Sequence, residues 1–168
     1  TGEVKFKGNT LFPESELWQS LEMLPGLTYS QFYVSQDMES IRNFYASEGY
    51  IEARVAPDVN LNKETGKVDV VYEITEGELF FVEKIQIRGN TKTRDKVIRR
   101  ELRIRPGGRF DGKKIEKSKQ RLENLGYFEG ITYDTEPSDT ATNRRDLIFR
   151  VKEKRTGDLS FGGGVSSI

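Results

Sequence analysis

The feature of the sequence that most constrains the fold is an eight-residue pattern that occurs twice, as Glu3–Thr10 and Lys84–Thr91. Within each copy apolar residues alternate with polar ones, which is the period of a strand with one buried face. Each copy then ends on Gly-Asn-Thr, and Gly-Asn is typical of a tight turn because both residues adopt positive φ readily. A pattern that recurs 81 positions later predicts a duplicated structural unit.

Two further dipeptides set the length of the repeat. Pro25-Gly26 recurs after 81 positions as Pro106-Gly107, whereas Gly49-Tyr50 recurs after only 77 positions as Gly126-Tyr127. The second copy therefore lacks four residues that the first copy contains between these two landmarks. The chain is a tandem repeat of about 80 residues.

Each copy is predicted to fold as a strand, two helices and two further strands. In the first copy the second helix ends at Gly49, which suits the left-handed cap of a helix, and strands follow over residues 50–59 and 67–75. The last strand of each copy is the most regularly apolar, so it is predicted to lie in the middle of its sheet. The fold class is α+β, with two tandem β-α-α-β-β domains over residues 1–78 and 79–155. Each domain is predicted to be a three-stranded mixed sheet that two helices cover on one face.

The second copy carries three local signals. Thr93 is predicted to cap its first helix and Asp111 its second, since both side chains can accept hydrogen bonds from free backbone N–H groups. The apolar alternation slips by one residue after Phe128, which predicts a β-bulge near Gly130.

The composition argues against catalysis. The chain contains no cysteine and no histidine, which removes disulfides, thiolate metal sites, the commonest metal ligand and the commonest general base. The carboxylates have the spacing of solvated faces rather than that of a catalytic set. We therefore expect no catalytic residues, no cofactor and no metal site, and we predict that the protein is not an enzyme.

The net charge of zero hides an asymmetry between the two copies. Residues 1–79 contain 6 Lys+Arg and 14 Asp+Glu, a balance of −8, whereas residues 80–168 contain 21 and 13, a balance of +8. The basic second copy makes nucleic-acid binding an alternative function, because phosphate contacts need such charge. Aromatic residues are not interleaved with the basic ones, however, and the acidic copy would repel the same ligand. Nucleic acid is therefore not expected as a partner.

Residues 156–168 belong to neither copy. In this segment Leu159, Phe161, Gly163 and Val165 occupy every second position. The positions between them are polar residues or glycines. This alternation is typical of a transmembrane β-barrel strand, so the segment is predicted to begin the first strand of a barrel.

Residues 3–155 resemble the POTRA repeat twice over. The resemblance rests on the strand that ends in Gly-Asn, the Gly-Tyr after the second helix, and the order of the elements. Residues 151–164 resemble the join between the last POTRA repeat and the first barrel strand of BamA-type outer-membrane protein assembly factors. The resemblance implies the fourth and fifth repeats of such a protein. POTRA repeats of two-partner secretion and organelle import relatives remain alternatives.

The same resemblance implies a function and a location. It implies a non-catalytic scaffold for outer-membrane protein insertion, in the periplasmic part of a Gram-negative outer-membrane protein. The implied partners are accessory lipoproteins, unfolded outer-membrane protein clients and the protein's own C-terminal β-barrel. The basic second repeat is also expected to meet the membrane surface.

Arg100 and Glu101 are the predicted partner-binding residues. Glu101 is one of the few acids in a basic run, and it is predicted to point outward because Ile98 and Leu102 are the inward positions of its helix. Arg105 is the neighbour that could pair with it at i+4. The resemblance implies that this helix of the last repeat contacts an accessory lipoprotein and that Glu101 falls on the matching motif position.

Client binding is expected at the edges of the sheets. With the last strand in the middle, the strand after the second helix becomes an edge, and its free N–H and C=O groups can pair with any extended chain. Pro57 fits an edge strand because it cannot donate to a ladder. The positions predicted to present these edges are Ile51, Ala53 and Val55 in the first repeat and Phe128, Ile131 and Tyr133 in the second.

Overall fold

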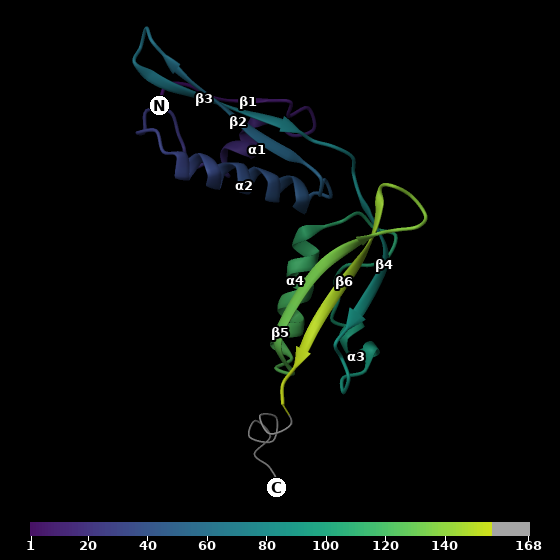
Figure 1. Ribbon diagram of the computed structural model, residues 1–168. Helices are drawn as coiled ribbons and strands as arrows, with labels where there is room; N and C mark the ends of the chain where they lie inside the picture. Colours follow the sequence, from purple (N-terminus) through teal and green to yellow (C-terminus); the bar gives the residue numbers. More distant parts are fainter. Residues whose placement is uncertain (156–168) are drawn as a thin grey trace. The chain divides into compact units, whose positions relative to one another are not determined.

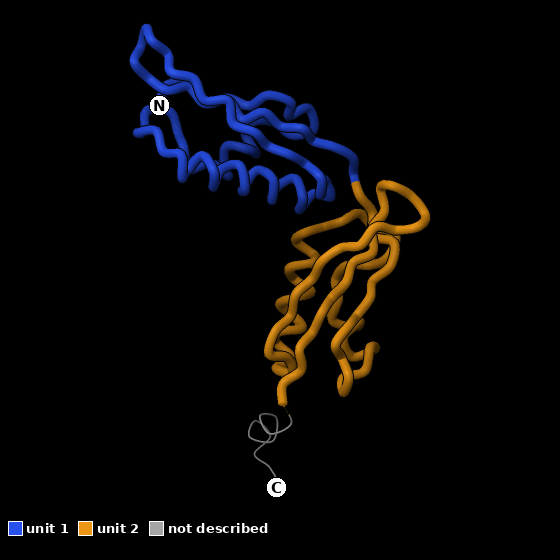
Figure 2. The backbone as a smooth tube through the Cα atoms, in the orientation of Figure 1, with its two compact units in different colours: residues 1–79 blue, residues 80–168 orange. Residues whose placement is uncertain are grey.

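The computed structural model describes residues 1–155, and the predicted barrel strand at residues 156–168 lies outside the described residues (Figure 1). The chain forms two compact units, with the boundary between Leu79 and Phe80 (Figure 2). Phe80 is buried, and its carbonyl accepts a hydrogen bond from the backbone of Phe110. The second unit therefore begins with a core residue.

Each unit has the order β-α-α-β-β, as predicted. The first unit contains β1 (Val4–Lys7), α1 (Glu14–Trp18), α2 (Gln31–Ser47), β2 (Arg54–Asn62) and β3 (Lys67–Thr75). The second unit contains β4 (Phe81–Arg88), α3 (Asp95–Arg99), α4 (Gly112–Asn124), β5 (Phe128–Pro137) and β6 (Arg144–Glu153). The predicted α+β fold class is confirmed.

Each unit has one three-stranded mixed sheet, ordered β1-β3-β2 in the first and β4-β6-β5 in the second. The outer strands β1 and β4 run parallel to the middle strand, and β2 and β5 run antiparallel to it. The last strand of each unit lies in the middle, as its regular apolar pattern predicted. The register of β5 against β6 shifts between Phe128 and Gly130, which confirms the predicted bulge.

The core of each unit lies between its helices and one face of its sheet, with α2 against β2 and α4 against β5. Apolar side chains on one face of each helix, and on every second residue of the strands, point into this core and are buried from solvent. The fully buried ones include Leu17, Ile41, Tyr45, Val70 and Tyr72 in the first unit and Ile98, Leu122, Leu147 and Phe149 in the second.

The four residues missing from the second repeat are one turn of a helix. Ser30 caps α2 and Asp111 caps α4, and these residues are 81 positions apart, so both helices start at the same place in the repeat. Helix α2 has 17 residues and α4 has 13. Because an α-helix has about 3.6 residues per turn, the loss preserves which face of the helix meets the core.

A buried polar side chain on each long helix ties down the chain that precedes it. In the first unit Asp37 is fully buried and accepts hydrogen bonds from Glu22 N (2.6 Å), Met23 N (3.0 Å) and the Tyr72 hydroxyl (2.7 Å). In the second unit Ser118 stands 81 positions after Asp37, and its hydroxyl accepts from Arg103 N at 2.7 Å. One repeat thus uses a carboxylate where the other uses a hydroxyl.

The Gly-Asn pair that ends the first strand of each repeat has two separate tasks. Gly8 and Gly89 have φ near +90°, and a Cβ at either would lie 2.1 Å from a carbonyl oxygen of the middle strand. The asparagines do not share the positive φ that the sequence predicted, because no non-glycine residue among residues 1–155 has it. Instead the Asn90 side chain donates to the Thr93 carbonyl at 2.9 Å and so closes the turn.

A glutamate at the end of each repeat closes the loop that follows this turn. Glu153 accepts from the backbone N–H groups of Thr91, Lys92 and Thr93 and from both threonine hydroxyls, at 2.7–3.0 Å. Glu76, 77 positions earlier, accepts likewise from Thr10 and Leu11. The prediction that Thr93 caps α3 is wrong, because its hydroxyl donates to the carboxylate and the N-cap position falls on Arg94. The predicted cap at Asp111 is confirmed.

Candidate binding surfaces

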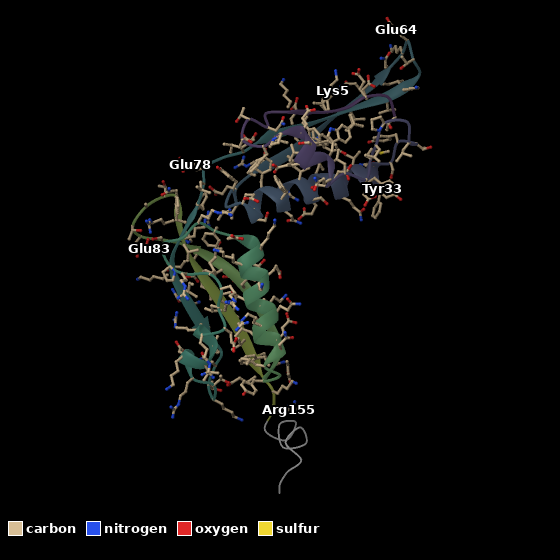
Figure 3. The ribbon with its side chains drawn as sticks, turned by 180° about the vertical axis from the view of Figure 1, so that it is seen from behind. Lys5, Tyr33, Glu64, Glu78, Glu83 and Arg155 are labelled. Atoms are coloured by element: carbon tan, nitrogen blue, oxygen red, sulfur yellow. The ribbon has the colours of Figure 1, made fainter. Side chains whose placement is uncertain are left out.

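Strand β2 presents the longest open edge of the first unit. Within residues 1–155 it pairs only with β3, and every residue from Ala56 to Leu61 is exposed. Together with β3 it forms a hairpin whose turn carries Glu64, while Tyr33 marks the start of α2 (Figure 3). A nine-residue strand with one free row of backbone groups is a template for a further strand.

Two of the three positions predicted to form this edge lie outside the strand. Ile51 is in a turn, and Ala53 is buried and donates its N–H to the Tyr50 carbonyl at 3.2 Å. The chain leaves α2 through the positive φ of Gly49 and needs this turn before it can extend. Of the three, only Val55 lies in β2, and the strand continues beyond the predicted end to Asn62.

The side chains of β2 that face the helices are all apolar. Val55, Pro57, Val59 and Leu61 stand opposite Ile74, Tyr72, Val70 and Val68 of β3. Val59 is 38% exposed and Leu61 63%, although both belong to the apolar face. Neither residue is among the predicted edge positions, although both continue the apolar alternation of the strand. An added strand could cover them.

In the second unit β5 is an edge strand of the sheet and matches β2. Of its three predicted positions, Phe128 and Ile131 are buried in the core, and Tyr133 is partly exposed. Burial and the nearby Glu116 of α4 raise the pKa of Tyr133. Its ring lies 6.2 Å from that of Phe149. Tyr133 is therefore the one predicted side chain that a strand added to β5 could touch.

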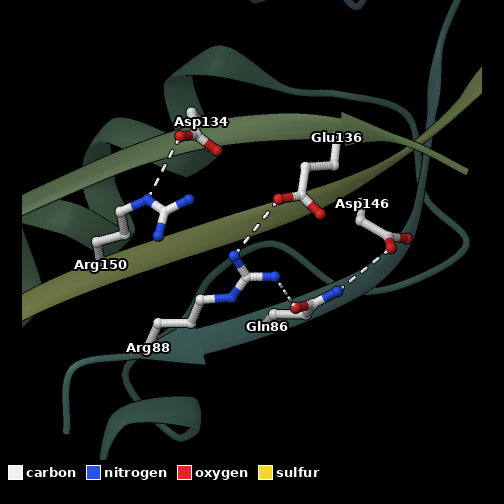
Figure 4. A network of polar contacts seen from close by, with 6 residues as sticks. All are labelled: Gln86, Arg88, Asp134, Glu136, Asp146 and Arg150. Atoms are coloured by element: carbon white, nitrogen blue, oxygen red, sulfur yellow. Dashed lines mark hydrogen bonds and ion pairs between the residues drawn. The ribbon is translucent and has the colours of Figure 1, made fainter.

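The face of the second sheet opposite the helices is closed by polar contacts (Figure 4). Arg88 reaches Glu136 at 3.4 Å and Gln86 at 2.7 Å, and Gln86 continues to Asp146 at 3.3 Å. Arg150 pairs with Asp134 at 3.4 Å. This charged surface does not suit an apolar client, which leaves the strand edges as the better candidates.

The structure places Glu101 differently from the prediction. Helix α3 ends at Arg99, so the helical period that pointed Glu101 outward does not reach it. Its side chain is only 17% exposed and pairs with Arg121 of α4 at 2.7 Å, not with Arg105. The Arg121 Nε also donates to the Glu101 carbonyl at 3.1 Å. Arg100, by contrast, is exposed.

Among residues 1–155 no group of three or more acidic side chains is placed to hold a metal ion. Within the same residues no helix is long and apolar enough to cross a bilayer.

The family model described as "Surface antigen variable number repeat", the POTRA family, matches residues 1–77 and 80–154. The chain therefore belongs to the POTRA family, with one repeat in each unit. The sequence resemblance to POTRA repeats is confirmed.

Similar proteins include assembly factors of bacterial outer membranes. The outer membrane protein assembly factor BamA of Neisseria meningitidis serogroup B is 36% identical over 164 residues, which are 97% of this chain and 21% of that protein. BamA of Nitratidesulfovibrio vulgaris is 28% identical over 170 residues, 99% of this chain and 21% of that protein. The chain thus spans about a fifth of the length of these curated relatives.

A solved structure has a similar fold. The crystal structure of BamA from Haemophilus ducreyi lacking POTRA domains 1–3 superposes with a TM-score of 0.75 and 25% identity. The match covers 93% of this chain and 29% of that one.

Proposed function

We propose that this chain is a non-catalytic periplasmic scaffold of the outer-membrane β-barrel assembly machinery. The observation that carries the proposal is the 36% identity to a BamA over 97% of the chain. We further propose that the two units are the fourth and fifth POTRA repeats, next to the protein's own C-terminal barrel. The match to a BamA that lacks POTRA domains 1–3 supports this position.

In the proposed mechanism, unfolded outer-membrane proteins add a strand to β2. Backbone hydrogen bonds give the affinity, so clients that share strand character but no sequence can all bind. The exposed apolar side chains of Val59 and Leu61 would be covered by alternate residues of the client. Binding is expected to be weak, because ordering a disordered client offsets much of the gain. Weak binding suits a scaffold that passes its clients on.

The edge can be blocked by a single proline. Pro57 is tolerated in β2 because its missing N–H faces away from β3, and Val55 lies two residues earlier with the same orientation. Val55→Pro should therefore leave the β2–β3 ladder intact while it removes one donor from the free edge. We expect about fivefold weaker binding of an unfolded barrel-strand peptide, measured by fluorescence anisotropy.

A charge change on a helix provides the control. Arg42→Glu on the exposed face of α2 should change peptide affinity less than Val55→Pro does. Amide shifts on peptide addition should map to residues 54–62. Shifts that gather on α2 and leave this strand unchanged would contradict strand addition.

We also propose that Arg100 and Glu101 contribute to docking of an accessory lipoprotein. Arg100 is exposed and available for direct contact. Glu101 is held by Arg121, and 17% of its side chain remains exposed. A partner would thus meet an acid whose position is already fixed, which favours recognition through charge complementarity.

Reversal of Glu101 should affect both folding and docking, so the two effects must be separated. Glu101→Lys places a second cation beside Arg121 and is expected to lower the free energy of unfolding by about 1 to 2 kcal/mol. The exchange of Glu101→Arg with Arg121→Glu should recover part of that stability. Docking of a purified accessory lipoprotein should stay weak in the exchanged variant, because the acid has moved. Full recovery of docking would show that Glu101 acts only through the fold.

A further inference from the structure

The second unit has a shallow pocket of about 390 Å³ beside the end of β6. Its walls come from the loop before α3, from α3 and the turn after it, from the residue before β5, and from the residues that end and follow β6. The lining side chains used below are Arg94, Val97, Arg100, Tyr127, Glu153 and Lys154. Described residues of this unit thus bring cations, an apolar side chain and an aromatic ring to one place.

The pocket has an excess of positive charge that the fold does not neutralise. Among residues 1–155, the side chains of Arg94, Arg100 and Lys154 form no ion pair and no hydrogen bond. Glu153 is a lining carboxylate, but both of its oxygens are occupied by the loop from Thr91 to Thr93. The nearby Asp95 pairs with Arg99 and accepts from Asn90. The three cations therefore remain available to a ligand.

The first unit has the same order of elements around this place but lacks these charges. At the matching positions, 81 residues earlier for α3 and 77 earlier for the end of β6, Arg94 becomes Pro13, Arg100 becomes Gln19 and Lys154 becomes Gly77. Glu76 closes its loop in that unit just as Glu153 does in the second. The repeat therefore folds and closes its loop without a single cation here, so the fold does not explain the charges.

The tyrosine of the pocket also differs between the two units. In the first unit Tyr50 packs against Phe12, with ring centroids 6.0 Å apart. The second unit has Thr93 in place of Phe12, and Tyr127, which matches Tyr50, is 44% exposed. The change turns a partly buried tyrosine at the rim of the core into a side chain that is exposed among cations.

We propose that this pocket binds the phosphate of an anionic lipid headgroup. Three cations supply the charge for a phosphate, while Tyr127 and Val97 suit the boundary between water and lipid, where amphipathic rings collect. The choice of a lipid rests on the proposed function, in which the chain after Arg155 enters the outer membrane. The pocket includes Lys154, the residue before Arg155, so the headgroups lie within its reach.

The test is binding of the whole chain to vesicles of phosphatidylcholine, alone or mixed with phosphatidylglycerol, followed by flotation. The pocket variant combines Arg94→Gln with Lys154→Gln and leaves Arg100 and Glu101 intact. The matched control combines Lys113→Gln with Lys117→Gln on the exposed face of α4 and removes the same charge. Each basic residue near an anionic surface contributes about a fivefold gain, so the loss of two should make the pocket variant bind the mixed vesicles roughly 25-fold less. The control should change less than about twofold.

Several results would overturn the proposal. Equal losses in the pocket variant and the control would mean that only overall charge matters. Binding of an acidic peptide at the pocket, without binding to mixed vesicles, would identify a protein partner instead. Inorganic phosphate that shifts the amides of residues 94, 100 and 127 while mixed vesicles do not bind would identify a site for small anions. Because client capture is assigned to β2, peptide binding would test the proposed function separately.

Discussion

Asp37→Ala is expected to lower the free energy of unfolding of the first unit by about 3 to 5 kcal/mol, although Asp37 lies in no proposed binding surface. The substitution leaves three donors without a partner: Glu22 N, Met23 N and the Tyr72 hydroxyl. Asp37 is fully buried, so water cannot easily replace the carboxylate. Burial and Asp37 hold the pKa of Tyr72 far above its usual value, so the hydroxyl stays protonated and needs an acceptor. Chemical denaturation followed by Trp18 fluorescence reports this unit alone, because the chain has one tryptophan.

The second repeat provides the matched control. There Ser118 replaces Asp37, and Phe149, 77 positions after Tyr72, has no hydroxyl to satisfy. Asp37→Ser combined with Tyr72→Phe gives the first unit the serine and phenylalanine of the second. The double variant should therefore be more stable than Asp37→Ser alone. Tyr72→Phe alone should cost about 1 kcal/mol. A double variant that loses the full sum of its single changes would show that the two positions are not coupled.

Much of the fold could be predicted because it follows from local patterns. The alternation of β3 and β6, the cap at Asp111 and the glycine that ends α2 each depend on residues close together in the chain. The slip after Phe128 revealed the bulge for the same reason. The duplication also helped, because each element was predicted from two copies of its pattern and both copies had to agree.

The errors arose where distant residues meet. Glu101 pairs with Arg121, 20 positions away, and no period within one helix could reveal that contact. Thr93 donates to Glu153, 60 positions away, so a residue with the character of a helix cap serves the loop closure instead. Ile51 and Ala53 fit a strand by alternation, but the turn after α2 delays the strand to Arg54. In the first two cases a side chain from another element overrides the local preference: Arg121 as a donor to Glu101, and Glu153 as an acceptor from Thr93.

For the proposed binding surfaces, the structure leaves both predicted strands at a sheet edge, but only part of the predicted residues are accessible there. Val55 and Tyr133 are accessible on β2 and β5, while Phe128 and Ile131 serve the core. The alternation identifies which residues share a face, but how far α2 and α4 cover that face depends on tertiary packing. The exposure of Leu61 is therefore a property that only the structure provides.

Acid should destabilise the second unit through Glu153. Partial burial raises the pKa of this carboxyl, but the hydroxyls of Thr91 and Thr93 and the backbone N–H groups of Thr93 and Lys92 outweigh it and lower the pKa from 4.5 to about 2. Because the folded state keeps the carboxylate charged while the unfolded state takes up a proton, the unfolded state binds more protons below about pH 4.5. The stabilisation is fully present above that pH and is lost as the pH falls towards 2. The pKa of Glu76 is lowered in the same direction, so the first unit should follow.

Glu153→Gln tests this account, because the amide keeps one acceptor oxygen but carries no charge and cannot titrate. At neutral pH the variant should lose about 2 kcal/mol of unfolding free energy in the second unit, measured by amide exchange of β6. Between pH 4.5 and pH 2 its stability should fall less steeply than that of the natural chain. Glu129→Gln, which removes an exposed carboxylate from β5, is the control and should leave the slope unchanged. If the slope were the same with and without Glu153, the acid sensitivity would have to come from other carboxylates, and the closed loop would contribute to stability only through its neutral hydrogen bonds.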